Sequence, residues 1–275
     1  MNPALQAHLK DLKLSGVIKT LDTRIEEATK GSLSYLEFFE LLVQDEVINR
    51  TGNANRKRMQ RARFRQHKTI EEFNFNYQPS INRQVIYNLA TCEFIRKKEN
   101  IALIGPPGTG KSHLAQAIGV KAVHQGYAVV FTTVSHMLEE LYISRADNSF
   151  NQKLKKYINP ELLILDELGL KKLNQNSVDD FYEIIAGRYE VKSTIITSNK
   201  TFDEWGHILY DPVLATAILD RFVHHCHFVT IKGESYRMKE RKGLVDSTTE
   251  KKPARRGRPP KNKSLDDKGG DDLGA

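Results

Sequence analysis

Apolar residues in the first part of the chain, residues 1 to about 69, recur at the spacing of amphipathic helices. The pattern comprises Leu5, Leu9, Leu12, Leu14, Val17, Ile18, Leu21 and Ile25. Gly31 is expected to end this helical stretch, and Ser34 with Glu37 three residues later forms a capping box for the next helix. Residues 1–69 are therefore predicted to form a small all-helical domain.

Short apolar runs alternate with helical patterns in the middle of the chain, from residue 70 to 245. The predicted strands are Ile101–Ile104, Tyr127–Thr132, Leu162–Asp166, Thr194–Ser198 and His227–Ile231. Strands that alternate with helices are typical of α/β proteins, in which helices cover both faces of a parallel sheet. Residues 70–245 are therefore predicted to form an α/β domain around a parallel sheet of these strands.

The remaining residues, 246–275, are polar and rich in Lys, Pro, Gly and Asp, so this tail is expected to be disordered when alone. No apolar run approaches the roughly 18 residues that span a membrane, and the N-terminus lacks the pattern of a secretory signal. Cys92 and Cys226 lie in apolar segments and are expected to be buried free thiols. We therefore expect a cytoplasmic protein without membrane contact.

The loop Gly105-Pro106-Pro107-Gly108-Thr109-Gly110-Lys111-Ser112 matches the pattern G-x-x-x-x-G-K-[ST] between a predicted strand and a helix. Backbone N–H groups in such a unit surround a phosphate, and a helix N-terminus lies behind it. Lys111 can reach the β- and γ-phosphates, while the Ser112 hydroxyl can bind Mg²⁺. The chain is therefore predicted to bind a nucleoside triphosphate. A glycine-rich turn before an ordinary helix is the weaker alternative.

The strand Leu162–Asp166 is followed by Glu167, so an apolar strand ends in two carboxylates. In P-loop enzymes the acid at this position holds the magnesium shell, which is the role we assign to Asp166. Glu167 is then placed to polarise the attacking water as a general base. A further predicted strand lies between the P-loop and this strand, which favours P-loop enzymes with a catalytic glutamate over kinases and G proteins.

Two further polar residues follow predicted elements. Asn199 comes directly after the strand Thr194–Ser198, where side chains line the ligand crevice of an open parallel sheet. It could bind the γ-phosphate or the water, but an Asn that starts a turn fits as well. Arg221 follows an apolar helical run and suits a phosphoryl transition state. A structural pairing of Arg221 with Asp220 is equally compatible, so the residues alone leave both assignments open.

The formal net charge of +8 is concentrated in two basic blocks without acids, residues 50–68 and 251–263. Basic blocks attract phosphate backbones, anionic lipids or acidic proteins. A solvated basic face without a partner is the alternative for either block. Two such blocks on one nucleotide-binding chain favour nucleic acid as the partner.

Several segments together resemble the IstB-type transposition helper ATPases, which belong to the AAA+ superfamily and share a clade with DnaC-type helicase loaders and DnaA initiators. The resemblance covers residues 5 to about 243. It rests on the motifs GPPGTGKSHLA, LLILDELG, IITSN, AILDRFVHHCHFVTIKGESYR, SLSYLEFFELLVQDE and RARFRQHKTIEEFNF. It implies an AAA+ fold without a full C-terminal lid domain.

The resemblance also implies roles for individual residues. Asn199 would be the sensor-1 residue, Arg221 an arginine finger acting on ATP held by an adjacent subunit, and Arg237 a sensor-2-like residue. Turnover would then require a homo-oligomer. Catalysis is assigned to Lys111, Glu167, Asn199 and Arg221. Nucleotide binding is assigned to Gly105, Pro106, Pro107, Gly108, Thr109, Gly110, Lys111, Ser112, His113 and Arg237. Ser112 and Asp166 are the expected Mg²⁺ ligands.

Three groups of residues are predicted to contact DNA. Arg58, Arg61 and Arg65 are spaced so that one helix face could carry them. In the initiator and loader clade, the region after the second strand faces nucleic acid, which points to Arg145, Lys153, Lys155 and Lys156. These contacts would be to phosphates and therefore sensitive to salt. Arg256 and Arg258 lie in an AT-hook-like sequence that suits a narrow minor groove. A chance match in a basic tail is its alternative.

The sequence His224-His225-Cys226-His227 is assigned no metal, because consecutive residues of one strand point to opposite faces. The sequence thus predicts an ATP-dependent, Mg²⁺-dependent AAA+ helper that assembles on duplex DNA and recruits or activates a cognate transposase. A replicative helicase loader with the same ATPase core is one alternative. A non-enzymatic architectural DNA-binding protein is another.

Overall fold

The computed structural model describes residues 2–209, 211–236 and 238 of the chain. Three helices come first: α1 (Pro3–Asp11), α2 (Ser15–Gly31) and α3 (Tyr35–Ala62). Ser34 and Glu37 form the predicted capping box at the start of α3. Val17 and Leu21 of α2 pack on Leu42 of α3 in a small apolar core. These helices therefore have a local core of their own.

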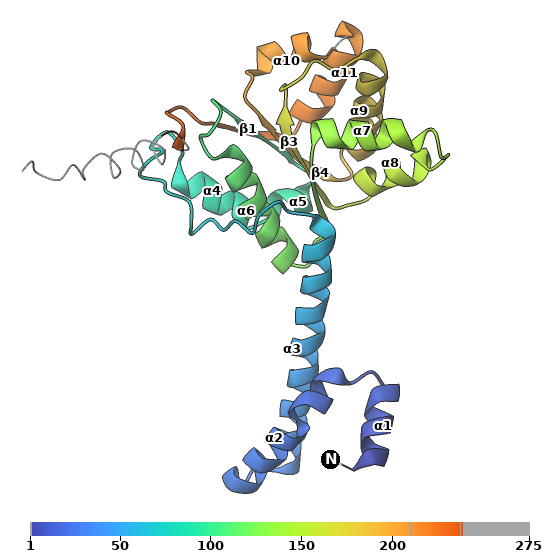
Figure 1. Cartoon of the computed structure of the whole chain (residues 1–275). Helices are drawn as coiled ribbons and strands as arrows, with labels where there is room; N and C mark the ends of the chain where they lie inside the picture. The colour runs from blue at the N-terminus through green and yellow to red at the C-terminus, as the bar shows by residue number, and fades with distance from the viewer. Residues whose placement is uncertain (1, 210, 237, 239–275) are drawn as a thin grey trace, which may run out of the picture. The chain divides into compact units, whose positions relative to one another are not determined.

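A five-stranded sheet forms the core of the part of the chain that follows α3 (Figure 1). Its strands are β1 (Asn100–Ile104), β2 (Val129–Thr133), β3 (Leu162–Leu168), β4 (Ser193–Ser198) and β5 (Cys226–Thr230). The strand order is β2-β3-β4-β1-β5, and every neighbouring pair is parallel. All the predicted strands are present, with ends shifted by one or two residues. The parallel sheet brings the carboxyl ends of β1, β3 and β4 to one edge.

Eight helices are assigned from residue 83 onward within the described part of the chain. They are α4 (Arg83–Ala90), α5 (Glu93–Lys97), α6 (Lys111–His124), α7 (Val134–Ser144), α8 (Phe150–Ile158), α9 (Gln175–Arg188), α10 (Phe202–Ile208) and α11 (Pro212–Val223). Helices α4, α5 and α6 pack on one face of the sheet. Helices α7 to α11 supply the apolar residues on the other face. The predicted covering of both faces is confirmed.

Alternation along the strands divides the core between the two faces. Leu162 and Ile164 belong to the cluster under α6, whereas Leu163 and Leu165 belong to the cluster under α7 and α9. All four side chains are fully buried. A strand buried on both faces has a continuous apolar sequence, which is why this run was recognisable as a strand.

The segment after α3 packs against the sheet domain. Arg63 is in the left-handed conformation (φ 57°) and ends the helix, and the Phe64 ring lies 6.1 Å from that of Phe131 on β2. The predicted helix face of Arg58, Arg61 and Arg65 is therefore wrong for Arg65, because α3 ends at Ala62. Ala62 and Ile70 are fully buried in the core below α6.

The chain divides into two units, residues 1–236 and 237–275, and Met238 is the one described residue of the second. The predicted tail at 246–275 lies outside the described residues. The residues after 236, where a lid domain would follow the last strand, lie outside them as well, except for Met238. The predicted limits at residues 69 and 245 remain predictions. Cys92 and Cys226 are both unpaired thiols, of which Cys92 is buried and Cys226 is partly buried. Within the described ranges, no helix is long and apolar enough to cross a membrane.

Candidate functional site

The P-loop connects β1 to α6, as its pattern predicts. Gly108 (φ 79°) and Gly110 (φ 97°) both have the left-handed backbone that favours glycine. A Cβ atom on Gly110 would lie 2.4 Å from the Phe73 ring, so no larger residue fits. The Thr109 hydroxyl donates a 2.8 Å hydrogen bond to the Pro106 carbonyl and closes the turn. The loop is therefore a backbone cradle that opens directly into the N-terminus of α6.

Lys111 is the first residue of α6 and is nearly buried, with 8% of its surface exposed. Its Nζ atom donates to the carbonyl oxygens of Gly105 at 2.7 Å and Pro106 at 2.6 Å. The ammonium group thus lies against the loop that its own motif forms. A phosphate held by the loop would meet a cation that is already in place.

Ser112 and Asp166 come together although they are far apart in sequence. The Ser112 hydroxyl donates to Oδ1 of Asp166 at 2.7 Å, and the Thr197 hydroxyl on β4 donates to the same oxygen. Asp166 is 2% exposed, so its carboxylate is held in a fixed position at the end of β3. A carboxylate beside a hydroxyl is a hard oxygen donor set, which fits Mg²⁺.

Glu167 lies at an irregularity between β3 and β4. The pairing passes from Leu165 with Ile196 to Leu168 with Ser198, so β3 carries one extra residue in this interval. Glu167 has φ 65°, and its backbone N–H donates to the Thr197 hydroxyl at 3.0 Å. Bulges of this kind redirect a side chain next to active sites. Its side chain is 39% exposed, as that of a group that must meet water has to be.

Asn199 follows β4, which lies between β1 and β3. Its Oδ1 atom is buried and has no hydrogen-bond partner among the described residues. Buried polar atoms in proteins are usually hydrogen-bonded, so an orphan oxygen here fits a ligand that completes the site. The neighbouring Ser198 is occupied, because its hydroxyl donates to the Leu168 carbonyl at 2.8 Å.

Arg221 lies in the last turn of α11 and is partly buried. It donates to the Ala217 carbonyl at 3.0 Å, and its guanidinium lies 5.2 Å from the centre of the Tyr182 ring. Among the described ion pairs there is none between Arg221 and Asp220. The structural alternative considered from the sequence is therefore not what holds this arginine.

The segment after β5 returns to the P-loop, a contact that the strand and helix patterns did not indicate. The Tyr236 N–H donates to the Gly108 carbonyl at 3.0 Å. The Tyr77 hydroxyl and the Gln78 amide donate to the carbonyls of Ser235 at 3.2 Å and Glu234 at 2.9 Å. Arg237, the predicted sensor-2-like residue, follows immediately but lies outside the described residues.

Residues 7–243 match the family described as IstB-like ATP binding protein. The chain belongs to this family. Among its relatives, it is 40% identical over 247 residues to the ATP-binding protein of insertion sequence IS21 from Pseudomonas aeruginosa, across 89% of this chain and 93% of the relative. It is 37% identical over 242 residues to that of IS5376 from Geobacillus stearothermophilus, across 88% and 96% of the two chains.

Solved structures give the fold of this IstB-like protein independently. DnaA from Aquifex aeolicus with AMPPCP bound has a TM-score of 0.53 and 21% identity, over 70% of this chain and 59% of that one. DnaI has a TM-score of 0.53 and 23% identity, over 63% and 93%. The predicted AAA+ fold is thus confirmed. The family description supports ATP as the ligand of this chain.

The basic residues predicted for DNA after β2 are mostly engaged within the IstB-like chain itself. Arg145 makes two hydrogen bonds to Asp180, at 2.9 and 2.6 Å, and its guanidinium lies 4.2 Å from the Phe150 ring centre. Lys153 at 2.8 Å and Lys156 both pair with Glu140. Lys155 is exposed. Arg145 is exposed as well, so Arg145 and Lys155 are the two exposed residues of the four, while Arg256 and Arg258 lie outside the described residues.

Glu140 joins α7 to α8. Burial raises its pKa, but hydrogen bonds from Lys153, Lys156 and the Tyr157 hydroxyl outweigh this and hold the pKa at about 2. The carboxylate is therefore charged at neutral pH and fixes both lysines. No sequence pattern indicated Glu140, because its partners lie on a different helix.

His224-His225-Cys226-His227 was assigned no metal because consecutive residues of one strand point to opposite faces. That premise is wrong for His224 and His225. His224 is the C-cap of α11 and His225 lies in the following turn, so neither belongs to β5. One ligand atom from each of these histidines and from Glu190 lies within 4.8 Å of the others. The turn, unlike a strand, lets neighbouring side chains converge. All three residues are exposed.

Proposed function

We propose that this chain is the ATP-hydrolysing helper of a transposon, which assembles as an oligomer on duplex DNA and recruits or activates the transposase. Hydrolysis would control assembly and release. The observation that carries the proposal is the cluster in which Ser112 and Thr197 hold Asp166 beside Glu167. The insertion-sequence relatives supply the biological setting.

The residues at the carboxyl edge of the sheet suit phosphoryl transfer to water. The P-loop and Lys111 bind and neutralise the phosphates, and Ser112 with Asp166 would hold Mg²⁺, which neutralises charge on the β- and γ-oxygens when bound. Glu167 accepts a proton from the attacking water. The orphan amide oxygen of Asn199 can orient that water. Together these groups supply positioning and electrostatic stabilisation, the main needs of this chemistry.

Arg221 is assigned to a neighbouring subunit's ATP. An arginine finger supplied by another subunit couples hydrolysis to assembly, because the ATP site is incomplete until that subunit is bound. The position of Arg221 at the end of α11, held by a helix carbonyl and stacked on Tyr182, supports a preformed surface arginine. A homo-oligomer is therefore the form in which turnover is expected.

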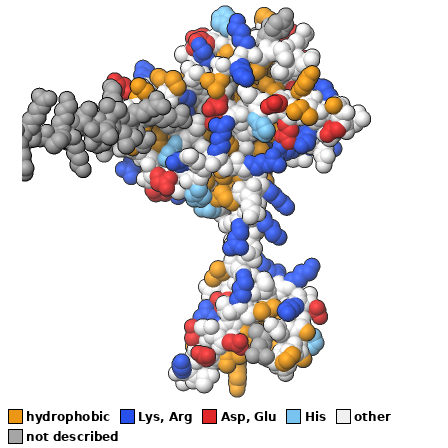
Figure 2. Space-filling model, in the orientation of Figure 1, with side chains coloured by type: hydrophobic (Ala, Val, Ile, Leu, Met, Phe, Trp, Pro, Cys, Tyr) orange, Lys and Arg blue, Asp and Glu red, His pale blue; other side chains and the backbone are white. Residues whose placement is uncertain are grey.

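Duplex DNA is the proposed substrate of the assembly. Arg56, Lys57 and Arg61 on α3 are exposed, and residues 50–68 contain no acid. Figure 2 shows Lys and Arg side chains along α3 on this face. Phosphate contacts of this kind are independent of sequence and weaken as salt rises. DnaA, whose fold this chain shares, has been solved with single-stranded DNA, with a TM-score of 0.52.

The N-terminal helices support a protein partner as well. A groove of about 550 Å³ lies between them, lined by Leu5, Leu9, Leu14, Val17, Leu21, Phe39, Leu42, Val43, Glu46, Val47 and Arg50. Phe39 is 62% exposed and Val47 58%. Exposed apolar patches of this kind mark protein interaction sites. The transposase is the partner that the family setting favours, and a cytoplasmic location follows from these partners.

The test measures the mass of the complexes that the protein forms on random-sequence duplex DNA, in ATP and in ADP and at two salt concentrations. Large complexes in ATP that dissociate in ADP are expected, and Lys111→Ala should abolish them. Equal small complexes in both nucleotides would overturn nucleotide-gated assembly. Loss of nearly all binding on deletion of residues 246–275 would instead favour an architectural DNA-binding protein. Binding to a replicative helicase rather than to the transposase would favour a helicase loader.

A further inference from the structure

The chain leaves α3 through a fixed turn that presents two arginines. Phe64 packs beside Phe131 and α6, and a Cβ atom on Gly119 would lie 2.9 Å from the Phe64 ring. The Gln66 N–H donates to the side chain of Gln116 at 3.2 Å. Arg63 and Arg65, on either side of Phe64, are both exposed. The segment that carries these two basic residues of the block 50–68 is therefore anchored to the sheet domain.

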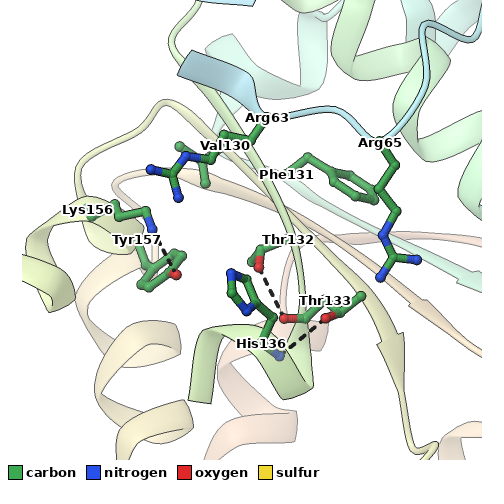
Figure 3. A pocket seen from close by; sticks show the side chains of 9 residues that line it. All are labelled: Arg63, Arg65, Val130, Phe131, Thr132, Thr133, His136, Lys156 and Tyr157. Atoms are coloured by element: carbon green, nitrogen blue, oxygen red, sulfur yellow. Dashed lines mark hydrogen bonds between the residues drawn. The ribbon is translucent and has the colours of Figure 1, made fainter. Parts of the chain in front are cut away.

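These arginines border a cavity of about 180 Å³ at the edge strand β2. It is lined by Arg63, Arg65, Val130, Phe131, Thr132, Thr133, His136, Lys156 and Tyr157. Figure 3 shows Arg63 and Lys156 on one side and Arg65 on the other, with the two threonines and His136 between them. No acidic residue is among the described side chains that line it.

The charge in the cavity is only partly balanced. Lys156 pairs with Glu140, which it shares with Lys153. Burial lowers the pKa of Lys156, and the positive charges of Arg63 and Lys153 lower it further against the effect of Glu140. Arg63 has no acid partner among the described ion pairs. The cavity therefore favours an anion.

The size of the cavity limits the anion that it can take. Sites for whole small molecules usually measure at least roughly 300 Å³, so a nucleotide does not fit. A single phosphate group does, and guanidinium groups are well suited to its oxygens. The occupant is thus either a free phosphate ion or one phosphate of a nucleic-acid backbone.

Arg65 also faces the catalytic edge. Its Nη1 atom lies 3.8 Å from Oε1 of Glu167, and the two side chains are 57% and 39% exposed. An ion pair between partly exposed side chains at this distance is weak, so Arg65 can leave Glu167 for another anion. While it persists, the Glu167 carboxylate is engaged by a cation instead of by water. Thr133 connects the cavity to the catalytic edge of the sheet. It lines the cavity, and on β2 it is the strand partner of Asp166 on β3.

We propose that this cavity binds a phosphate, in the assembly a backbone phosphate of duplex DNA, and that the phosphate takes Arg65 away from Glu167. DNA binding then releases the general base for hydrolysis. The inference rests on the proposed function, because it needs hydrolysis through Glu167. It gives the basic block at the end of α3 a direct route to the ATP site.

The test measures the steady-state ATPase rate of the full chain against duplex concentration. Arg65→Ala should hydrolyse ATP about two- to fivefold faster than wild type without DNA, the range expected for loss of a weak ion pair. It should also respond less to DNA. Arg63→Ala and Lys156→Ala should need more duplex for half-maximal stimulation. Arg96→Ala is the matched control, since Arg96 is 73% exposed, pairs with a surface glutamate and lies outside the cavity.

The outcomes separate this inference from the proposed function. Wild-type protein that does not hydrolyse ATP would overturn both. Wild-type hydrolysis with an Arg65→Ala curve that matches wild type, or a slower basal rate with unchanged stimulation, would overturn the inference alone. Inorganic phosphate added in place of duplex, at the same concentration of phosphate groups, distinguishes a free phosphate ion from a backbone phosphate as the occupant. Stimulation by duplex only identifies backbone phosphate, stimulation by both identifies free phosphate as well, and Arg65→Ala must weaken either response.

Discussion

The hydroxyl of Ser112 donates a 2.7 Å hydrogen bond to Oδ1 of Asp166, which joins the P-loop helix α6 to the end of β3. The same carboxylate oxygen accepts from Thr197 on β4. Three elements therefore meet at one buried atom before any ligand binds. Such preorganisation is what electrostatic catalysis requires, because the groups need not reorganise during the reaction.

Asp166→Asn should remove the magnesium dependence of ATP binding. An amide keeps the shape of the side chain but loses the charge that holds a divalent cation. Hydrolysis should fall by at least about 100-fold, because metal stabilisation of the transferred phosphoryl group is worth several kcal/mol. Titration of ATP with Mg²⁺ and with EDTA checks this result. An Asp166→Asn protein that still binds ATP more tightly with Mg²⁺ would contradict the assignment, and Asp220→Asn on the exposed side of α11 is the control.

Glu167→Gln should bind ATP normally and hydrolyse it about 10²- to 10⁴-fold more slowly, the usual contribution of a general base. Gln retains the size and the left-handed backbone position but cannot take the proton. Single-turnover hydrolysis measured beside equilibrium ATP binding separates the two effects. Weaker ATP binding with an unchanged hydrolysis rate would assign Glu167 to binding instead.

Thr197→Val should lower the hydrolysis rate by about tenfold while the protein stays folded, since side chains that hydrogen-bond a metal ligand typically contribute 10- to 100-fold. The Thr197 hydroxyl contacts both Asp166 and the backbone N–H of Glu167, so Val loosens both carboxylates at once. The control is Thr91→Val, because Thr91 is exposed and its hydroxyl bonds only the nearby Asn88 carbonyl among the described hydrogen bonds. Equal rates for the two variants would show that Thr197 has no positioning role.

The sequence predicted the fold and the P-loop well because each depends on local pattern. The strands β1 and β3 are apolar on both faces, and glycines fall where the loop needs left-handed backbone. Thr197 was not predicted, because its role depends on β4 lying beside β3 and no motif records that contact. Glu167 was predicted as a base, but the bulge that redirects it arises from the β3 and β4 register.

The DNA contacts were the least predictable part of the candidate site. A basic residue has the same sequence signal whether it meets solvent, DNA or an acid on another helix. Arg145 and Lys153 have intramolecular partners in Asp180 and Glu140 that only the packing of α7, α8 and α9 reveals. Arg65 was assigned to a helix face, yet it lies in the turn after α3 and reaches Glu167.

Arg188→Met should destabilise the fold by about 1–3 kcal/mol, the cost of leaving buried hydrogen-bond acceptors without a donor. Arg188 is 1% exposed and donates to the Thr194 hydroxyl and to the carbonyls of Tyr157, Ile158, Pro160 and Ser193. Met fills part of the space but leaves these acceptors without a donor. Denaturant unfolding measures the loss. Arg96→Met should change stability by less than about 0.5 kcal/mol, and a similar small change for Arg188→Met would show that solvent replaces the arginine.

Mixing two inactive variants tests whether Arg221 acts between subunits. Arg221→Ala leaves Glu167 intact, whereas Glu167→Gln still binds ATP and leaves the arginine intact, so each should hydrolyse ATP slowly alone. In a 1:1 mixed oligomer, an intact Glu167 can lie beside an intact Arg221 from a neighbour, and about one interface in four regains both groups only if the arginine acts in trans. The expected result is therefore partial recovery of ATPase activity on mixing, measured at a fixed total protein concentration with duplex present. If Arg221 served its own subunit, no mixed interface would be complete and the mixture would stay as inactive as its parts. The double variant mixed with wild type is the control for simple dilution, because it can supply neither group.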